Sequence, residues 1–400
     1  MKMRWILLIL MGFSWVQVRG QQDPWLAGRA MMISGAYDSA VHQLNRALEL
    51  KQGNAEILYQ LGICHFEENN NPAAREAFYE TEKRQKGRGS LYLARTEVRL
   101  NHPELALKYL RIHLSSRYKV PEKEILLDEE LSRLEGEPGW QQLWNEKRWY
   151  SQGDMKFQEA QFMKAHGEAL EAINLLNKLE KQGYQRSKVQ TEKAEVYALL
   201  GNTKAAQSEL RSAVKSDLRN LDALYLLASY QVEEGDADEA LSGLNRVIRQ
   251  EPDRFEAYLL RATARSENED LSGALEDLEL YLTYFPNHPG AWYQKGLIQH
   301  AHGKYLNAIQ SYNRALEMEQ GDAQYYFARG RTYASTGTTR YAEKDMSMAL
   351  DLDPYNGEIW FEKGKLSDQL GDRIGACHCY RRAYQYGIFE AGEMIEKQCN

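Results

Sequence analysis

Alanine recurs at a fixed interval of 34 residues through most of the sequence, and this interval constrains the fold more than any other feature. The series runs through Ala172, Ala206, Ala240, Ala274, Ala308, Ala342 and Ala376, and Ala40, Ala74 and Ala106 form a shorter series before it. Twelve residues before each of these alanines lies another glycine or alanine, and four residues after it lies a large residue. A constant period of this length predicts an array of structural units, each packed on its neighbours.

The positions within one unit predict two antiparallel helices. In the unit around Ala308 the earlier small residue is Gly296, and an interior glycine destabilises a helix by about 1 kcal/mol relative to alanine. We expect close approach of the two backbones at Gly296 and Ala308 to offset this loss, with Tyr312 filling the gap between successive hairpins. Gly303 lies where a left-handed residue would end the first helix. The equivalent glycines are Gly35, Gly167, Gly201, Gly235, Gly337 and Gly371.

The units that keep the pattern best resemble a known family. They are residues 292–316 (WYQKGLIQHAHGKYLNAIQSYNRAL) and residues 359–383. Three units also end in a proline, at Pro252, Pro286 and Pro354. On these motifs the chain resembles the tetratricopeptide repeat family over residues 22–112 and 151–388. The resemblance implies an all-α fold, a right-handed α-solenoid of about ten helical hairpins with one degenerate helix pair and a C-terminal capping helix.

The repeat pattern divides the chain into segments. Three repeats occupy residues 21–112, seven occupy 153–388, and residues 389–400 should form the capping helix that covers the open end. Between the arrays, residues 113–152 form a spacer in which 120–134 has the pattern of one acidic amphipathic helix. Two interpretations of the spacer remain open. It is either a drifted repeat that packs continuously, or a joint whose cluster from Trp140 to Trp149 makes contacts between the arrays.

The N-terminus has the pattern of an export signal. Lys2 and Arg4 precede the apolar run WILLILMGFSWV, and Gly20 offers a cleavage site before Gln21. The run is shorter than the ~20 residues that span a bilayer. We therefore expect a signal peptide over residues 1–20 and an exported bacterial protein, periplasmic or secreted, with no membrane span after cleavage. An uncleaved N-terminal anchor is the alternative.

The resemblance also predicts where a partner would bind. In tetratricopeptide repeats the first helix of each hairpin lines a concave groove, and the fifth residue of each repeat points into it. Here the aromatic residues Tyr225, Tyr293, Phe327 and Phe361 occupy fifth positions, and His300 also faces the groove by position. We expect them to form a ladder of rings that grips a peptide. The alternative is that these rings pack on the adjacent repeat.

Two basic residues stand beside the last rings of this ladder. Arg331 and Lys365 lie one turn after Phe327 and Phe361, where together they could bind an acidic side chain or a terminal carboxylate. The competing interpretation is that Glu358 or Asp368 balances their charges.

Catalytic and cofactor-binding motifs are missing from the sequence. It contains no Gly-x-Ser-x-Gly, no His-Glu-x-x-His and no phosphate-binding loop, so we expect no enzyme, no cofactor and no metal. Cys377 and Cys379 are two residues apart on an expected helix and face different directions. An oxidising compartment instead permits a disulfide bond between Cys399 and either of them.

These features predict a scaffold. A net charge of −7 argues against nucleic-acid binding, which depends on Lys and Arg. We expect an exported, non-enzymatic protein that binds a protein or peptide in the concave groove. The alternative is a structural accessory of a cell-envelope assembly or secretion complex that docks through its convex face or through residues 113–150.

Overall fold

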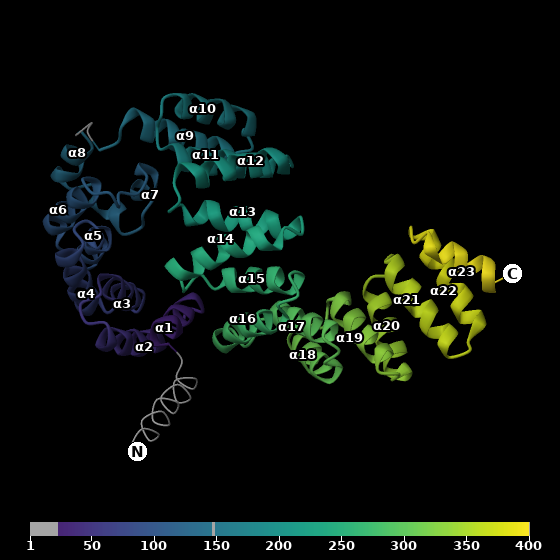
Figure 1. Ribbon diagram of the computed structural model, residues 1–400. Helices are drawn as coiled ribbons and strands as arrows, with labels where there is room; N and C mark the ends of the chain where they lie inside the picture. Colours follow the sequence, from purple (N-terminus) through teal and green to yellow (C-terminus); the bar gives the residue numbers. More distant parts are fainter. Residues whose placement is uncertain (1–22, 146–148, 400) are drawn as a thin grey trace, which may run out of the picture. The chain divides into compact units, whose positions relative to one another are not determined.

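The computed structural model of the chain describes residues 23–145 and 149–399, and the expected signal peptide lies outside them. Every regular element in the described residues is helical, and consecutive helices pack as pairs (Figure 1). The chain forms two compact units, Met1–Ala223 (unit 1) and Leu224–Asn400 (unit 2). The prediction of an all-α array of hairpins is confirmed.

Unit 1 contains five hairpins and the spacer. Its first three hairpins are α1 (Pro24–Ile33) with α2 (Tyr37–Leu50), α3 (Ala55–Glu67) with α4 (Asn71–Arg84), and α5 (Ser90–Arg99) with α6 (Pro103–Leu114). The spacer holds α7 (Glu122–Leu126), the 3-10 helix η2 (Leu131–Leu134) and α8 (Pro138–Trp144). The last two hairpins are α9 (Gln152–Ala165) with α10 (Ala169–Lys181), and α11 (Arg186–Leu199) with α12 (Thr203–Ser216).

Unit 2 contains five hairpins and the final helix. Helix α13 (Leu221–Glu233) begins three residues before the boundary and packs against α14 (Ala237–Gln250). The next pair is α15 (Glu256–Glu267) with α16 (Leu271–Tyr284). Next come α17 (Pro289–Ala301) with α18 (Tyr305–Met318), α19 (Ala323–Ser335) with α20 (Thr339–Leu352), and α21 (Gly357–Gln369) with α22 (Arg373–Gln385). Helix α23 (Glu390–Gln398) ends the array. The described residues therefore contain the ten predicted hairpins and the predicted final helix.

The repeated spacing of small and large residues sets the packing within a hairpin. A Cβ atom at Gly296 would lie 2.5 Å from Cε1 of Tyr312, the large residue on the second helix of the same hairpin. A Cβ atom at Gly62 would likewise lie 2.5 Å from the ring of Phe78, and one at Gly364 would lie 2.6 Å from the ring of Tyr380. This corrects the expected role of the glycine. The atoms nearest to the absent Cβ belong to the ring of Tyr312, so the glycine makes room for the large residue of its own hairpin.

Each hairpin turn contains one residue in the left-handed backbone conformation. The seven predicted turn glycines have φ between 70° and 82°, with Gly303 at 70°. In the three remaining hairpins Asn69, Asn101 and Glu269 take the same conformation, with φ of 58°, 61° and 60°. The geometry of the turn is therefore kept in all ten hairpins, even where glycine is absent.

The closing prolines are held by the next repeat. The indole Nε1 of Trp292 donates to the carbonyl oxygen of Pro286 at 2.8 Å, and that of Trp360 donates to Pro354 at 2.9 Å. In an earlier repeat the hydroxyl of Tyr258 donates to Pro252 at 3.1 Å. An aromatic donor near the start of each of these repeats thus fixes the end of the preceding hairpin.

The spacer packs into the core of unit 1. Its buried residues join those of α5 and α6 in one cluster, which includes Ala94, Leu110, Leu114, Ile125, Leu131, Leu134, Trp140, Leu143 and Trp149. The interpretation of continuous packing holds on this side of the spacer. The prediction of one helix over residues 120–134 is wrong, because the chain turns between α7 and η2. Asp128 in this turn pairs with Arg95 at 2.6 Å, and Glu130 pairs with Arg99 at 2.7 Å.

Helix α23 covers the end of unit 2. Its Ala391 is buried in a cluster with Phe361, Ala376, Tyr380 and Ala383 of the last hairpin. A disulfide bond joins Cys377 on α22 to Cys399 beyond α23, whereas Cys379 is a free, buried thiol. The predicted capping helix is confirmed, and of the two bonds that the sequence permits the structure has the one between Cys399 and Cys377.

Candidate binding groove

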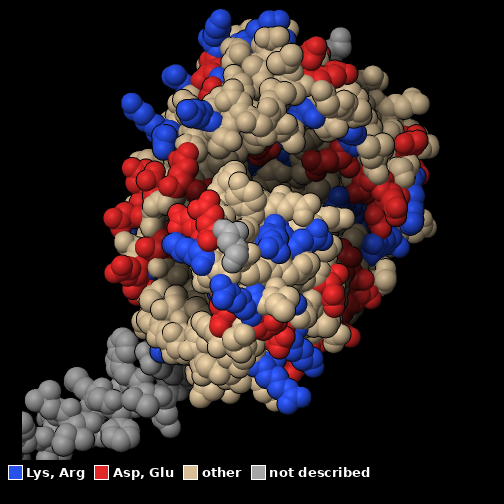
Figure 2. All heavy atoms as spheres, turned by 90° about the vertical axis from the view of Figure 1, so that its right-hand side faces the viewer, with Lys and Arg blue, Asp and Glu red and all other residues tan. Residues whose placement is uncertain are grey.

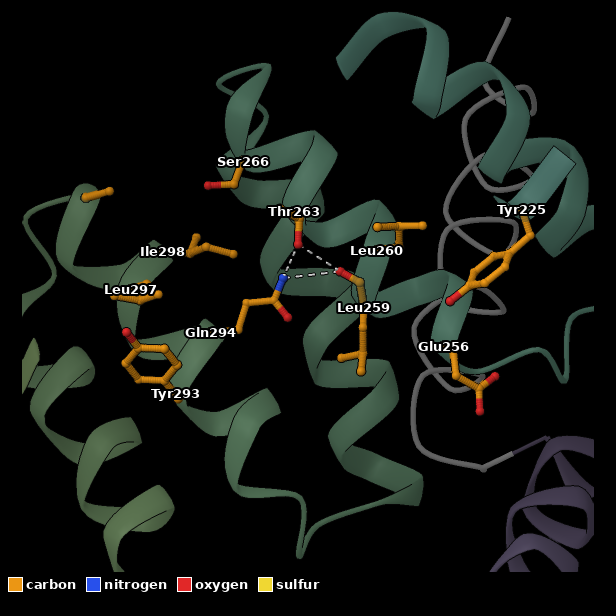
Figure 3. Close-up of a pocket in the computed structure, with 11 residues that line it drawn as sticks. Tyr225, Glu256, Leu259, Leu260, Thr263, Ser266, Tyr293, Gln294, Leu297 and Ile298 are labelled. Atoms are coloured by element: carbon orange, nitrogen blue, oxygen red, sulfur yellow. Dashed lines mark hydrogen bonds between the residues drawn. The ribbon is translucent and has the colours of Figure 1, made fainter. Parts of the chain in front are cut away.

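An open cavity of about 700 Å³, which we call the apolar pocket, lies between the first helices of two successive repeats in unit 2 (Figure 3). Leu259 and Leu260 line it from α15, and Leu297 and Ile298 line it from α17. Tyr225 of α13 and Tyr293 of α17 also line it. Leu297 is 41% exposed, so the pocket presents apolar surface to water.

A glutamine fixes the two walls of the apolar pocket. The Nε2 of Gln294 on α17 donates to Oγ1 of Thr263 at 2.6 Å and to the carbonyl oxygen of Leu259 at 3.2 Å, both on α15 (Figure 3). Hydrogen bonds between neighbouring helices hold the walls at a set separation, so the shape of the pocket does not depend on a ligand.

A second cavity of about 240 Å³, the polar pocket, adjoins the first. Tyr293 and Leu297 line both cavities, and His300, Phe327, Arg331 and Glu358 contribute to the second. The imidazole Nδ1 of His300 lies 2.8 Å from Oγ1 of Thr332 on α19. Burial lowers the pKa of His300, and the nearby Arg331 charge lowers it further, so the ring is neutral at pH 7. Together the two pockets form what we call the groove.

Two arginines on helix α19 differ in how they are paired. Arg329 binds Asp345 through Nε at 2.7 Å and through Nη2 at 2.8 Å, and its Nη1 donates to Asn313 at 2.6 Å. Arg331 has a single ion pair, to Glu358 at 3.8 Å, and no side chain in the described residues accepts a hydrogen bond from its guanidinium. Arg329 is thus satisfied within the fold, whereas the donors of Arg331 remain available to a ligand.

The structure brings five of the seven predicted groove residues together. Tyr225, Tyr293, Phe327, Arg331 and His300 line the two pockets. The ring of Tyr293 also lies 4.9 Å from that of Tyr325 in the next repeat, so both interpretations of the aromatic ladder apply to it.

The other two predicted groove residues line neither pocket. Phe361 is 5% exposed and its ring lies 5.9 Å from that of Tyr380, so it is a core residue and not a solvent-facing member of a ladder. Lys365 donates to Glu362 at 2.8 Å on its own helix. The idea that Arg331 and Lys365 act as a pair is not supported, and Asp368 accepts the hydroxyl of Tyr380 instead of balancing a lysine.

Sequence reasoning missed the aliphatic part of the groove. Leu259 stands at a fifth position, but its side chain is not aromatic and so it is not part of the expected ladder of rings. Leu297 lies four residues after Tyr293, one helical turn along the same face. That spacing was the available signal.

Three further observations concern membrane spans, metal sites and the distribution of charge in the described residues. No helix in the described residues combines the length and the apolar character that crossing a bilayer requires. No group of three or more His, Cys, Asp or Glu side chains in the same residues is arranged to hold a metal ion. On the face shown in Figure 2, basic and acidic side chains are interspersed rather than separated by sign.

The repeated hairpins and the groove along their first helices define a helical-repeat protein of the kind that presents a binding surface to other proteins. Two family models described as tetratricopeptide repeat match the chain, one over residues 31–93 and 197–264, the other over 259–324 and 293–357. Together these matches include more than half of the chain, which belongs to the tetratricopeptide repeat superfamily.

Individual relatives share only part of their sequence with this chain. Superkiller complex protein 3 of Homo sapiens is 31% identical over 97 residues, which is 23% of this chain and 6% of that protein. The Mus musculus protein of the same name is 30% identical over 110 residues, 26% of this chain and 7% of the other. The chain thus matches less than a tenth of the length of these relatives.

A solved structure supports the fold. A tetratricopeptide repeat protein from Parabacteroides merdae aligns with a TM-score of 0.52 at 17% identity, over 62% of this chain and 99% of the other. At this identity the likeness concerns the fold alone. The family as a whole consists generally of protein-interaction scaffolds rather than enzymes.

Proposed function

We propose that the chain is an exported, non-enzymatic scaffold that binds a segment of a partner protein in the groove of unit 2. The observation that carries the proposal is the exposed apolar floor of the apolar pocket, with Leu297 41% exposed inside a cavity of about 700 Å³. Covering apolar surface stabilises a complex by roughly 25 cal/mol per Å² before the costs of association are subtracted. A partner side chain seated beside Leu297 provides this gain.

The fixed walls of the groove support the same proposal. Gln294 joins α17 to α15 through two hydrogen bonds, so a ligand need not first order the site. Tyr225 and Tyr293 line the same pocket. Partly buried tyrosines bring large contact area at small entropic cost, which is why they are frequent at binding surfaces.

Export is part of the proposal. It depends on residues 1–20, which have the pattern of a signal peptide and lie outside the described residues. The bond between Cys377 and Cys399 supports it, because disulfide bonds persist in oxidising compartments such as the periplasm or the extracellular space. The partner would then belong to the cell envelope or its surroundings. Trp140 and Trp149 are buried, and this does not favour docking through the spacer.

The test is capture of partners from the organism that encodes the chain. Immobilised wild-type protein is compared with Leu297→Glu, which places a charge in the apolar pocket, and with Leu306→Glu. Leu306 is the matched control because it is 74% exposed on the second helix α18. We expect Leu297→Glu to lose at least about tenfold of the captured partner, which corresponds to about 1.4 kcal/mol, while Leu306→Glu retains it. Equal capture by all three proteins, at equal thermal stability, would contradict the proposal.

A further inference from the structure

The polar pocket contains a cation, Arg331, beside the apolar pocket. Arg331 is 49% exposed, and its guanidinium lies 5.7 Å from the centre of the Phe327 ring. A guanidinium held near an aromatic face is restricted in position, and it is more weakly hydrated than a lysine ammonium. The Arg331 cation therefore already lies in the groove, and a ligand that binds it loses little free energy to ordering or dehydrating the guanidinium.

The internal partner of Arg331 is weak. Glu358 lies 3.8 Å away, beyond hydrogen-bond distance, and its own side chain is 60% exposed. An ion pair between exposed groups at this distance contributes little. Arg329 on the same helix shows how this fold pairs an arginine fully, with two bonds to Asp345. Arg331 therefore differs from Arg329, because its guanidinium has only a long ion pair and no hydrogen-bonded carboxylate.

We infer that the groove selects a partner segment in which bulky aliphatic side chains fill the apolar pocket and a neighbouring acidic side chain pairs with Arg331. The inference rests on the proposed function and deepens it. Tyr293 and Leu297 line both pockets, so the aliphatic and acidic residues of the partner are close in its sequence.

Two other polar groups that line the polar pocket are already engaged within the fold. His300 is kept neutral by burial and by Arg331, and it already contacts Thr332. The side chain of Asn356 accepts from two backbone N–H groups at the start of α21 and donates to Asp353. Among the described residues, Arg331 is the one cation that lines this pocket, and its guanidinium has donors for a single carboxylate.

The probe is an array of synthetic peptides with amidated C-termini. Each peptide carries a Leu-Leu pair followed, at a short spacing that varies along the array, by Asp, Asn or Lys. A matched series replaces the Leu-Leu pair by Ser-Ser, and another has Asn with a free C-terminal carboxylate. Binding of the full chain is measured at low salt by fluorescence anisotropy.

The wild-type chain should bind the best Asp peptide about tenfold more tightly than its Asn counterpart, which is the ratio expected for one charge-assisted hydrogen-bonded pair. Arg331→Gln should abolish this preference, and Arg331→Glu should transfer it to the Lys peptide. Glu358→Gln should strengthen it by releasing Arg331. Lys365→Gln is the control and should leave it unchanged, because Lys365 is paired with Glu362.

The outcomes separate the two proposals. Leucine-dependent binding with equal affinity for Asp and Asn peptides would overturn the charge requirement and leave the proposed function intact. So would an Asp preference that survives Arg331→Gln, or equal binding by the peptide with the free terminus. Absence of any difference between Leu-Leu and Ser-Ser peptides would overturn the proposed function and this inference with it.

Discussion

Gly296 and Tyr312 fit against each other across one hairpin, with the missing Cβ of the glycine only 2.5 Å from the ring. The two residues are sixteen positions apart, and the same relation joins Gly62 to Phe78 and Gly364 to Tyr380. Five other hairpins have alanine at the first position and leucine at the second. These pairs are Ala94 with Leu110, Ala160 with Leu176, Ala194 with Leu210, Ala228 with Leu244, and Ala262 with Leu278.

This relation predicts a compensating pair of substitutions. Gly296→Ala should lower the free energy of unfolding by about 1–2 kcal/mol, because overpacking at Tyr312 exceeds the gain in helix propensity. Adding Tyr312→Leu should recover part of this loss, since alanine and leucine pair elsewhere in the chain. Urea unfolding of the wild type, both single variants and the double variant measures the coupling. Strictly additive effects would contradict the steric account.

The left-handed turn residues predict opposite effects in two hairpins. Glu269 is exposed and has φ of 60°, a conformation that disfavours non-glycine residues by roughly 1–2 kcal/mol. Glu269→Gly should therefore raise the free energy of unfolding by about 1 kcal/mol, whereas Gly303→Ala should lower it by a similar amount. Thermal unfolding followed by circular dichroism compares the two variants. A midpoint that falls with Glu269→Gly would show that backbone strain is not the controlling factor.

His113 predicts a loss of stability in acid. The ring is 2% exposed, its Nε2 accepts the N–H of Val120 at 3.1 Å, and burial lowers its pKa to about 4. The unfolded chain takes up the proton near pH 6.5 and the folded chain does not, so stability falls as pH drops from 7 to about 4. The total loss from this group is about 3 kcal/mol. Urea unfolding of the wild type and of His113→Gln over this range isolates it, and parallel profiles would rule out His113 as the cause.

Loss of the disulfide bond should destabilise only the C-terminal end of the array. Cys377 and Cys399 are 22 residues apart, and closing a loop of this length is worth about 3 kcal/mol in the chain-entropy model. Cys399→Ser, or reduction of the wild type, should increase amide hydrogen exchange in α22 and α23 while α1 to α6 remain unchanged. Unaltered exchange in α23 would mean that packing around Ala391 alone holds the cap.

The repeated elements could be predicted because each depends on local chemistry seen ten times. Gly303 and its equivalents indicated the turns, and the 34-residue period indicated the hairpins, since both follow from the backbone and the size of one side chain. The contact partner of Gly296 could not be derived in this way. Spacing places Ala308 and Tyr312 on the same helix face, and only the packed structure decides which of them meets the glycine.

The candidate site was predicted less completely. Phe361 occupies the same repeat position as Phe327, but it is buried in a cluster that extends to Ala391 of the capping helix, an environment found at the end of the array. The helix expected over residues 120–134 is interrupted between α7 and η2, where Asp128 and Glu130 pair with arginines of α5. At both places the chain makes tertiary contacts that a single repeat does not encode.

Crosslinking from the groove tests the central claim most directly. A photoreactive phenylalanine analogue is placed at Leu297, or at Leu306 as the control, and the chain is irradiated in the organism that encodes it. Binding of a partner in the groove predicts a discrete protein adduct from position 297 that is missing from position 306 and is lost when Arg331 is also changed to Glu. Adducts of equal yield from both positions, or none from position 297 in cells where the partner is captured by the unmodified chain, would contradict it.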